Sequence, residues 1–336
     1  MTTTRLRRAV AALASAAIVV IAVVEWVLVV VRPESGPLGV VQIMAPHLAI
    51  LGLVLVPLAL LGRTRAGAIA IIALGLVSAI RFGGDWISLP ASIPAPDRLR
   101  LEVVTWNLEV GSRPGTDSAA MIRAHPADIV ALQELRPDAA EAIEADPEIT
   151  ARYRYRQLVP RADVGGMGVL SRVPISEPTF GLDPILQTAT IDLGDGRRLA
   201  LVNAHPFHAE IELLGSTRVP IGLDPSRRND DLAAIRRRID ELVHDGTPVV
   251  MLGDLNTAAS EPAFDRFVAG LRDVHQEVGL GTGWTWRPIR FEFLGIGLIR
   301  IDHVIVSPDV LPLGIGEACP PAGDHCLVHA EIALPD

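Results

Sequence analysis

The chain begins with long apolar stretches and continues with short apolar runs that end in polar residues. Residues 9–31 contain a single charge, Glu25, over a length that is sufficient to cross a bilayer. Residues 38–61 form a second apolar stretch without charges. Residues 66–80 would reach only about 22 Å as a helix, less than the apolar core of a bilayer, unless the following residues continue it. We therefore predict a membrane domain with three N-terminal transmembrane helices over residues 1–89.

The arginines predict how this domain is oriented. Three of them precede the first stretch and two follow the second, whereas the loop between the two stretches has only Arg32. Because cytoplasmic loops are enriched in basic residues, we expect a multi-pass plasma-membrane protein whose remaining chain is extracytoplasmic. A cleaved signal peptide is the alternative for the first stretch, but two further apolar stretches follow it and favour an anchor.

A second region begins after a proline-rich segment, residues 90–97, whose composition predicts a stiff and extended linker. Residues 98–336 are numerous enough for one α/β catalytic domain. Runs of strand length alternate there with helical patterns, such as the apolar stripe over residues 230–244. Polar residues end or follow several of the runs. They are Asn107, Glu134, Asn203, His205, Asp254, Asn256, Asp302, Asp324 and His325.

Asp254 and Asn256 are the most informative pair, because they lie two residues apart at the end of the apolar run 247–252. Side chains at i and i+2 of a strand point to the same face, so two oxygen ligands would lie side by side. A divalent cation or a polarised water suits that arrangement, whereas a simple turn is the alternative. The convergence of several polar strand ends favours the cation, since unpaired buried carboxylates are costly.

Six short motifs follow one another in the second region. They are Trp106-Asn107, Leu132-Gln133-Glu134, Asn203-Ala204-His205, Gly253-Asp254-Leu255-Asn256, Ile301-Asp302-His303 and Gly323-Asp324-His325. In their order and spacing the chain resembles the endonuclease/exonuclease/phosphatase superfamily. Gly323 stands where serine is usual and Cys326 where arginine or histidine is usual, but neither change removes a ligand. The resemblance implies an α/β fold, a two-sheet αββα sandwich with the site at one edge.

The resemblance also implies a metal site. Glu134 corresponds to the main carboxylate ligand of Mg2+, Asn107 to a second metal-site residue, and Asp324 to a further metal or supporting carboxylate. Mn2+ is the alternative cation.

The catalytic roles that the resemblance implies fall on five residues. Asp254 and Asn256 correspond to the pair that orients the attacking water and a phosphate oxygen. His205 matches the position that stabilises charge on the phosphoryl oxygens. His325 matches the catalytic histidine, oriented by Asp302. We expect His325 to accept the proton of the water, with Asp254 as the alternative base.

The charge of the chain narrows the class of substrate. The chain has a net charge of −9, and residues 97–336 hold 23 arginines against 36 acidic residues, a balance of −13. A nucleic-acid duplex is bound through a basic footprint, so a general nuclease is disfavoured and nucleic acid is not an expected partner. A tethered domain instead meets substrates at the membrane surface at high effective concentration. We expect the lipid bilayer as a partner and a phosphate-bearing lipid as the substrate.

The layout of apolar segments before an external domain resembles the membrane phosphatases related to VanJ, as do the local stretches Arg228-Asn229-Asp230-Asp231-Leu232 and Trp284-Thr285-Trp286-Arg287-Pro288. This second resemblance implies hydrolysis of undecaprenyl pyrophosphate, the lipid carrier of cell-wall synthesis. The expected activity is a metal-dependent hydrolysis of phosphate or pyrophosphate esters at the outer membrane face. An extracytoplasmic Mg2+-dependent endo/exonuclease and a sphingomyelinase-like phosphodiesterase are the alternatives. A membrane-binding protein without activity is disfavoured by the complete set of site residues.

Two further features remain. Cys319 and Cys326 flank Asp324 and His325 in the part predicted to be outside, where a close pair predicts a disulfide, with two unrelated buried thiols as the alternative. Residues 206–226 and 290–299 are rich in apolar side chains outside the strand-like runs. Ordinary packing and contact with lipid both remain open for these two segments.

Overall fold

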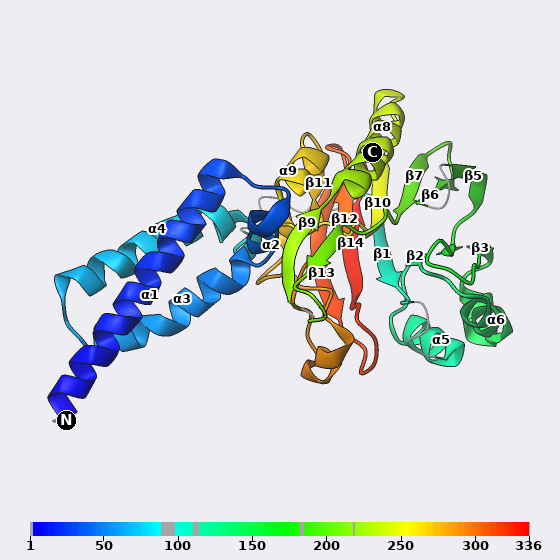
Figure 1. The fold of residues 1–336 in the computed structure, drawn as a ribbon. Helices are drawn as coiled ribbons and strands as arrows, with labels where there is room; N and C mark the ends of the chain where they lie inside the picture. Colours follow the sequence, from blue (N-terminus) through cyan, green and yellow to red (C-terminus); the bar gives the residue numbers. More distant parts are fainter. Residues whose placement is uncertain (1–2, 89–97, 110–113, 182–184, 218, 336) are drawn as a thin grey trace. The chain divides into compact units, whose positions relative to one another are not determined.

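The structure is a computed structural model that describes residues 3–88, 98–109, 114–181, 185–217 and 219–335 (Figure 1). The chain forms two compact units. The first comprises Met1–Gly84 together with Glu210–Pro225 and Ser260–Pro262, and the second comprises the other residues. The linker predicted over residues 90–97 lies outside the described residues.

Four helices make up most of the first unit. They are α1 (Thr3–Val31), α2 (Gly36–Ile43), α3 (Ala45–Leu60) and α4 (Arg65–Trp86). Helices α1 and α4 are long and apolar enough to cross a membrane, while α2 and α3 form a pair bent by 58°. The bend lies just before Pro46, whose ring disfavours helical backbone at the preceding residue. The described residues of the first unit therefore form two candidate spans, or three if the bent pair is one span.

Helix α4 continues beyond the apolar stretch that the sequence shows, and its 22 residues give a length of about 33 Å. Arg81 lies in this continuation, and its Nη1 is 2.8 Å from Oε2 of Glu25 in α1. Both side chains are buried in the unit. The single acid of the first stretch is thus paired, because an isolated charge among apolar helices would be costly.

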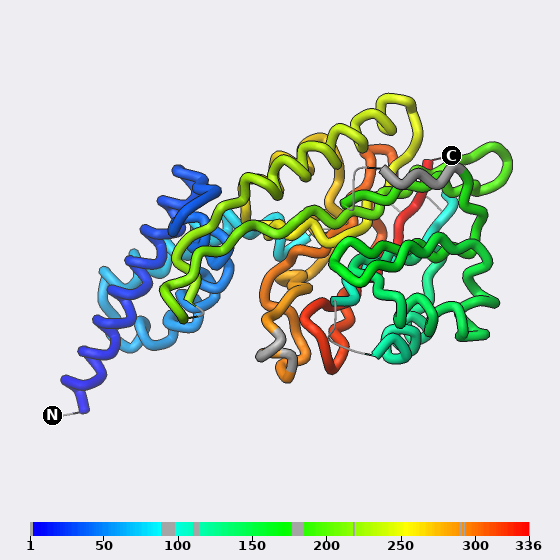
Figure 2. Tube along the Cα trace, turned by 45° about the vertical axis from the view of Figure 1, so that its right-hand side comes forward, coloured from blue at the N-terminus to red at the C-terminus, as the bar shows by residue number. Residues whose placement is uncertain are grey.

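A hairpin from the middle of the sequence completes the first unit. Its strands are β8 (Glu210–Leu213) and β9 (Pro220–Asp224), which run antiparallel to each other (Figure 2). Strand β9 packs against α2. Leu223 of β9 is buried there.

The second unit contains two six-stranded sheets. The first sheet has the order β13-β14-β1-β2-β4-β3. In that order its strands are Leu311–Ala318, Leu327–Ala333, Arg100–Asn107, Ile129–Gln133, Met167–Ser171 and Tyr155–Val159. The second sheet has the order β11-β12-β10-β7-β6-β5. Its strands are Arg272–Asp273, Asp302–Val306, Val249–Asp254, Arg198–Ala204, Leu186–Asp192 and Ile175–Gly181.

Helices cover the outer faces of both sheets. They are α5 (Gly115–Ala124), α6 (Pro137–Ala145), α7 (Pro147–Arg152), α8 (Ser226–His244) and α9 (Pro262–Val268). The first three pack on the first sheet and the last two on the second. Two short elements lie beside them, α10 (Val274–Val278) and a 3-10 helix, η1 (Ile289–Leu294). The apolar stripe predicted over residues 230–244 is confirmed, although α8 begins four residues earlier.

The main core lies between the sheets, where apolar side chains of both meet, such as Val103 and Ile129 with Leu201 and Val250. Each sheet is mixed: β1 and β2 are parallel in the first, and β7 and β10 are parallel in the second. The predicted α/β class is confirmed. Its layers are helix, sheet, sheet and helix (Figure 1).

A buried polar network joins the two sheets close to the carboxyl ends of their parallel strands. Nε2 of Gln133 donates to Oδ1 of Asn203 at 2.8 Å. Nδ2 of Asn203 donates in turn to the carbonyl oxygens of Leu132 and Gly168 in the opposite sheet, at 3.1 and 3.2 Å. Asn203, one of the polar strand ends singled out in the sequence, therefore connects the sheets.

Replacing Asn203 with leucine should destabilise the protein strongly. The change removes the hydrogen bond that Gln133 donates to Asn203, and those that Asn203 donates to Gln187 and to the two carbonyl groups, all in a buried place, at a cost of about 3 kcal/mol. Gln133 keeps its hydrogen bond to Thr105. We expect the thermal midpoint of the full chain in detergent to fall by roughly 6–12 °C. Glu141→Leu, on the exposed surface of α6, is the control and should stay close to the parent. An unchanged midpoint in Asn203→Leu would contradict the role given to this network.

Candidate active site

The predicted site residues lie at one edge of the second unit, where strands of both sheets end. Asn107 ends β1 and Glu134 follows β2, while Asp254 ends β10 and His205 follows β7. Because β1 and β2 are parallel, and β7 and β10 likewise, their carboxyl ends point to one edge in each sheet. Strand β12 runs antiparallel to β10, and its first residue, Asp302, pairs with Asp254.

The amide group of Asn107 brings four of these residues together. Its Nδ2 atom lies 3.1 Å from Oε1 of Glu134 and 3.0 Å from Oδ2 of Asp254. The same nitrogen lies 3.5 Å from Nε2 of His205. The other ring nitrogen of His205, Nδ1, is 3.2 Å from the carbonyl oxygen of Val164, which fixes the plane of the ring. Residues from both sheets thus converge on one point.

The backbone at this point is strained. Glu134 has φ 54° and Asn256 has φ 48°, a left-handed conformation that costs a residue with a Cβ atom about 1–2 kcal/mol. Asparagine tolerates it better than most residues, but glutamate does not. Strain of this kind persists where the surrounding structure enforces it, commonly at functional sites.

The local structure at Asp254 and Asn256 corrects one expectation. Strand β10 ends at Asp254, so the alternation of a strand does not extend to Asn256. Oδ1 of Asp254 accepts the backbone N–H of Asn256 at 2.7 Å, which is the turn that the sequence left as the alternative. Oδ2 of Asp254 is the atom that faces Asn107. One carboxylate therefore shapes the turn and also belongs to the site.

Asn256 is held by its neighbours. Its Nδ2 donates to the carbonyl oxygen of Pro206 at 3.0 Å. Arg228, a fully buried residue of α8, donates from Nη1 to the carbonyl oxygen of Asn256 at 2.9 Å. These contacts fix the turn after Asp254 and direct the amide group of Asn256 towards Pro206.

His325 and Asp302 form a buried pair. Nδ1 of His325 lies 3.1 and 3.0 Å from the two carboxylate oxygens of Asp302. Nε2 faces Oδ2 of Asp254 at 3.6 Å and Oδ1 of Asp324 at 3.8 Å. The predicted orientation of His325 by Asp302 is thus present. It leaves Nε2 directed at the remaining carboxylates.

The charges around His325 decide its protonation. Burial by itself lowers the pKa of the imidazole, but the carboxylates of Asp302, Asp254 and Asp324 outweigh burial and raise that pKa to about 10. Burial, followed by the charge of Asp302, raises the pKa of Asp254. Burial also raises the pKa of Asp324, to about 7. The negative charge of the carboxylates at this site is therefore only partly neutralised by the positive charge of the imidazole.

The donor set fits a divalent cation. The carboxylates of Glu134 and Asp254 both approach Nδ2 of Asn107, and carboxylate oxygens are ligands that Mg2+ and Mn2+ favour. The amide oxygen of Asn107 accepts the backbone N–H of Glu109 at 2.9 Å, so Asn107 would have to turn its amide group to offer that oxygen to a cation. Ligand atoms of Asp254, Asp302 and His325 also lie within 4.8 Å of one another. A cation on that second set would displace the proton shared by Asp302 and His325. Glu134, Asn107 and Asp254 are therefore the better candidate ligands.

Asp324, the third predicted metal residue, lies on the side of the histidine. Its Oδ2 accepts from Nε1 of Trp286 at 3.0 Å, and its backbone N–H donates to Oε2 of Glu109 at 3.0 Å. With Oδ1 near His325, these contacts support a role beside the imidazole more directly than a role as a ligand.

Sequence reasoning gave no role to the residues that support this half of the site. Oγ1 of Thr285 accepts the N–H groups of Ile301 and Asp302 at 3.2 and 3.1 Å. Arg287, which is fully buried, donates from Nη2 to the carbonyl oxygen of Pro320 at 2.7 Å. They come from a single segment, residues 284–288, that contains two tryptophans. Nothing in its polarity pattern indicated contact with Asp302.

The disulfide predicted between Cys319 and Cys326 is present. It closes a loop that contains Asp324 and His325, with the two cysteines separated by seven positions. Cys326 is buried directly after His325. The disulfide thus restrains the segment that carries His325.

Replacing both cysteines with serine should loosen this segment. Because the disulfide closes a short loop, its removal is expected to lower the free energy of unfolding by about 2–3 kcal/mol. We also expect kcat to fall by about tenfold while KM changes little, because the position of His325 is affected more than substrate binding. The measurement is the steady-state rate of the double variant beside the oxidised parent. Equal kcat values for the two would show that the disulfide does not position the histidine.

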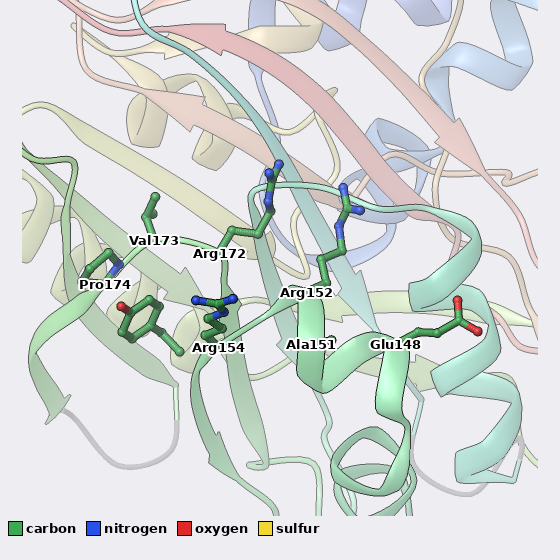
Figure 3. A pocket seen from close by; sticks show the side chains of 8 residues that line it. Glu148, Ala151, Arg152, Arg154, Arg172, Val173 and Pro174 are labelled. Atoms are coloured by element: carbon green, nitrogen blue, oxygen red, sulfur yellow. The ribbon is translucent and has the colours of Figure 1, made fainter.

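A separate hollow of about 650 Å³ lies elsewhere in the second unit (Figure 3). Three arginines contribute to its lining, Arg152, Arg154 and Arg172, of which Arg172 pairs with Asp128 at 2.7 Å. None of its lining residues belongs to the strand-end site. The chemistry argued above therefore does not involve this hollow.

Comparison with known proteins agrees with this geometry. The model of the Endonuclease/Exonuclease/phosphatase family matches residues 104–325 of the 336, a range that contains every site residue from Asn107 to His325. The chain belongs to this family. Its members are hydrolases that act on phosphoester bonds.

Solved structures of the family share the fold. A Bacteroides thetaiotaomicron family protein is 18% identical, with 71% of this chain and 100% of that chain covered and a TM-score of 0.54. The 3' phosphatase NExo from Neisseria, bound to a product DNA hairpin, is 21% identical, with coverages of 68% and 98% and a TM-score of 0.53. TDP2 from D. rerio, complexed with single strand DNA product, is 17% identical, with coverages of 69% and 98% and a TM-score of 0.52. No curated protein matches the chain in sequence.

Proposed function

We propose that this protein is a membrane-anchored, divalent-metal-dependent phosphoesterase that hydrolyses a lipid-linked phosphate or pyrophosphate at the outer membrane face. One observation carries the proposal: a phosphoesterase-family site with its Asp302–His325 pair is present in a chain that also has two or three helices apolar enough to span a membrane. A site tethered in this way acts on substrates that reach it along the bilayer.

The mechanism assigns a task to each residue near the phosphate. Glu134 and Asn107 would hold the cation, which would supply charge neutralisation on the phosphate when bound. Asp254 takes the proton from the attacking water, since its raised pKa makes it a stronger base than an ordinary aspartate. His325, kept protonated by Asp302, donates hydrogen bonds to the phosphoryl oxygens as charge develops there. His205 and Asn256 orient the phosphate and the water.

In this mechanism Asp254 is the general base, a role that the sequence analysis assigned first to His325. The carboxylates around His325 favour the alternative, because an imidazole with a pKa of about 10 is already protonated at neutral pH. It stabilises negative charge in that form and does not accept a proton.

The rate should therefore depend on pH in a defined way. Asp254 must be ionised, and because its pKa is raised above 3.8, activity should be lost on acidification at a higher pH than for an ordinary aspartate. His325 must be protonated, so activity should fall again as the pH rises through the pKa of the imidazole. We expect the alkaline loss of kcat/KM to disappear in His325→Gln. Disappearance of the acid loss instead would return the role of base to His325.

The substrate class rests on charge and anchoring. The balance of −13 over residues 97–336 opposes binding to nucleic acid, even though two of the similar solved structures contain DNA. Undecaprenyl pyrophosphate, as implied by the resemblance to VanJ-related phosphatases, is the proposed lipid. A sphingomyelinase-like phosphodiesterase is the second candidate, because the same site chemistry cleaves either side of a phosphate.

The deciding experiment measures inorganic phosphate release from undecaprenyl pyrophosphate by the full chain in detergent with Mg2+. A plasmid-nicking assay and a His325→Ala variant accompany it. Phosphate release that is lost in the variant, without nicking, supports the proposal. Nicking without phosphate release would establish an external nuclease. Inactivity in both assays would redirect the search to phosphodiester lipids.

A further inference from the structure

The β8–β9 hairpin has one apolar face that is only partly covered. Side chains alternate along β8, so Ile211 and Leu213 point to one face and Glu210 and Glu212 to the other. Leu223 of β9 pairs with Ile211 and lies on the same face. The hairpin is therefore amphipathic, a pattern that suits a boundary between water and an apolar phase.

The covered part of that face lies against the helices of the first unit. Leu223 is buried, and its Cδ2 would lie only 3.3 Å from a Cβ atom added at Gly39 of α2. The absence of a side chain at Gly39 thus permits close packing between α2 and β9. Glu210–Pro225 consequently belongs to the unit of apolar helices, although it lies between the site residues His205 and Arg228 in the sequence.

Other apolar side chains of the hairpin are exposed. Ile211 and Leu213 on this face are 57% and 44% exposed, and Leu214 and Val219, which flank the turn, are 53% and 52% exposed. On α2, Leu38 is 46% exposed. Water-exposed apolar area is unfavourable by about 25 cal/mol per Å², so four such side chains on a short hairpin indicate a partner.

The first unit indicates what that partner is. Helix α2 is separated from the apolar helix α1 by only Arg32–Ser35, so α2 begins where a span would leave the bilayer. Apolar side chains of α1, such as Val20, Val23 and Val30, are exposed in the same way as those of the hairpin. A lipid bilayer that surrounds these helices would also meet a hairpin packed on α2.

We infer that the β8–β9 hairpin inserts Ile211, Leu213, Leu214 and Val219 into the outer leaflet of the membrane. The inference rests on the proposed membrane anchoring. Both ends of the hairpin continue directly into the site: Pro206 accepts from Asn256, and Arg228 donates to Asn256. Four residues connect His205 to β8, at most about 14 Å of extended chain. The hairpin is therefore connected to the site by short segments at both of its ends.

Site-specific fluorescence tests the insertion. The native cysteines are joined in a disulfide, so one new cysteine in the full chain can carry an environment-sensitive NBD probe. The test positions are Leu213→Cys and Leu214→Cys, in vesicles of phosphatidylglycerol and phosphatidylethanolamine. Glu141→Cys, on the exposed surface of α6, is the water-exposed control. Val20→Cys, on an apolar helix, reports anchoring by itself.

The expected result is a blue-shifted emission at Leu213 and Leu214, together with quenching by lipids that carry a spin label on the acyl chain. Glu141→Cys should be quenched by aqueous iodide instead. Iodide quenching at both hairpin positions, with lipid quenching at Val20, would overturn the inference and leave the anchoring intact. Absence of lipid quenching at Val20 would overturn the proposed anchoring and the inference with it.

A second measurement connects insertion to turnover. Leu213→Ser/Leu214→Ser removes two apolar side chains from the hairpin and leaves every site residue in place. We expect kcat/KM for a lipid pyrophosphate in vesicles to fall by about tenfold or more, since burial of both leucine side chains in lipid is lost. Hydrolysis of bis-p-nitrophenyl phosphate, which is soluble, should stay within about twofold. An equal loss on both substrates would assign the hairpin to the folding of the site, and unchanged hydrolysis of the lipid would overturn its role in turnover.

Discussion

His325→Ala should lower kcat on every phosphoester substrate of this protein by about 10³- to 10⁴-fold, with a small change in KM. The imidazole is the cationic group that faces Asp254 and Asp324, and it is held from behind by both oxygens of Asp302. Its interactions strengthen as charge develops on the phosphoryl oxygens, so their loss is felt in the transition state more than in substrate binding. Steady-state kinetics over a range of substrate concentrations measures this directly.

The matched control is His329→Ala. His329 lies on β14, shortly after His325 in the sequence, but its ring is half-exposed and lies 4.0 Å from Glu102. We expect kcat within about twofold of the parent, as for most surface substitutions. Loss of less than tenfold in His325→Ala, with the protein folded, would remove the histidine from the mechanism.

Asp302→Asn separates positioning from charge. The amide can keep a hydrogen bond to His325 but no longer supports the imidazolium, so its effect should be large and should not add to that of His325→Ala in the double variant. Additive losses would mean that Asp302 acts independently of the histidine.

The ends of the strands were predictable because a buried strand can be recognised by its apolar composition. The runs before Asn107, Glu134, His205 and Asp254 are mostly apolar, and most of their residues are buried. A polar residue at the end of such a run has few roles other than capping, pairing or binding. The sequence therefore indicated which residues would meet, and the structure brings them together around the amide of Asn107.

The support of the site was not predictable, because it depends on long-range packing. Thr285 bonds the backbone of Asp302 across sixteen or more positions, and Arg287 is satisfied by a carbonyl group thirty-three positions away. No periodicity places these residues. The same holds for the bend between α2 and α3, where the apolar composition is continuous and a proline interrupts the helix. Composition alone indicates one span at that position.

The hairpin shows a third limit. Its apolar residues were visible in the sequence, but apolar residues occur both in segments that pack in a core and in segments that contact lipid. Only the position of Leu223 against Gly39 of α2 separates the buried part of the face from the exposed part.

Glu134 provides the second large effect, through the cation. Chelation by EDTA should abolish activity, and Mg2+ or Mn2+ should restore it, because the carboxylates of Glu134 and Asp254 need a counter-charge to bind a phosphate ester. Glu134→Gln keeps the size of the side chain and removes its charge. We expect the metal concentration for half-maximal activity to rise by about 10- to 100-fold and kcat to fall by about 10²-fold. Titration of the rate with Mg2+ measures both quantities. Full activity in EDTA would contradict the whole assignment.

Glu134→Gly distinguishes loss of a ligand from loss of structure. Glu134 has φ 54°, a conformation that glycine adopts without strain, so the variant should be at least as stable as the parent, by up to about 1 kcal/mol. It should nevertheless be as inactive as the chelated enzyme. If the strained backbone serves only to position the carboxylate ligand, the variant should become more stable and lose activity at the same time. If Glu134→Gly lowers the thermal midpoint instead, the left-handed backbone is supported by the side chain, and the loss of activity no longer identifies Glu134 as a ligand.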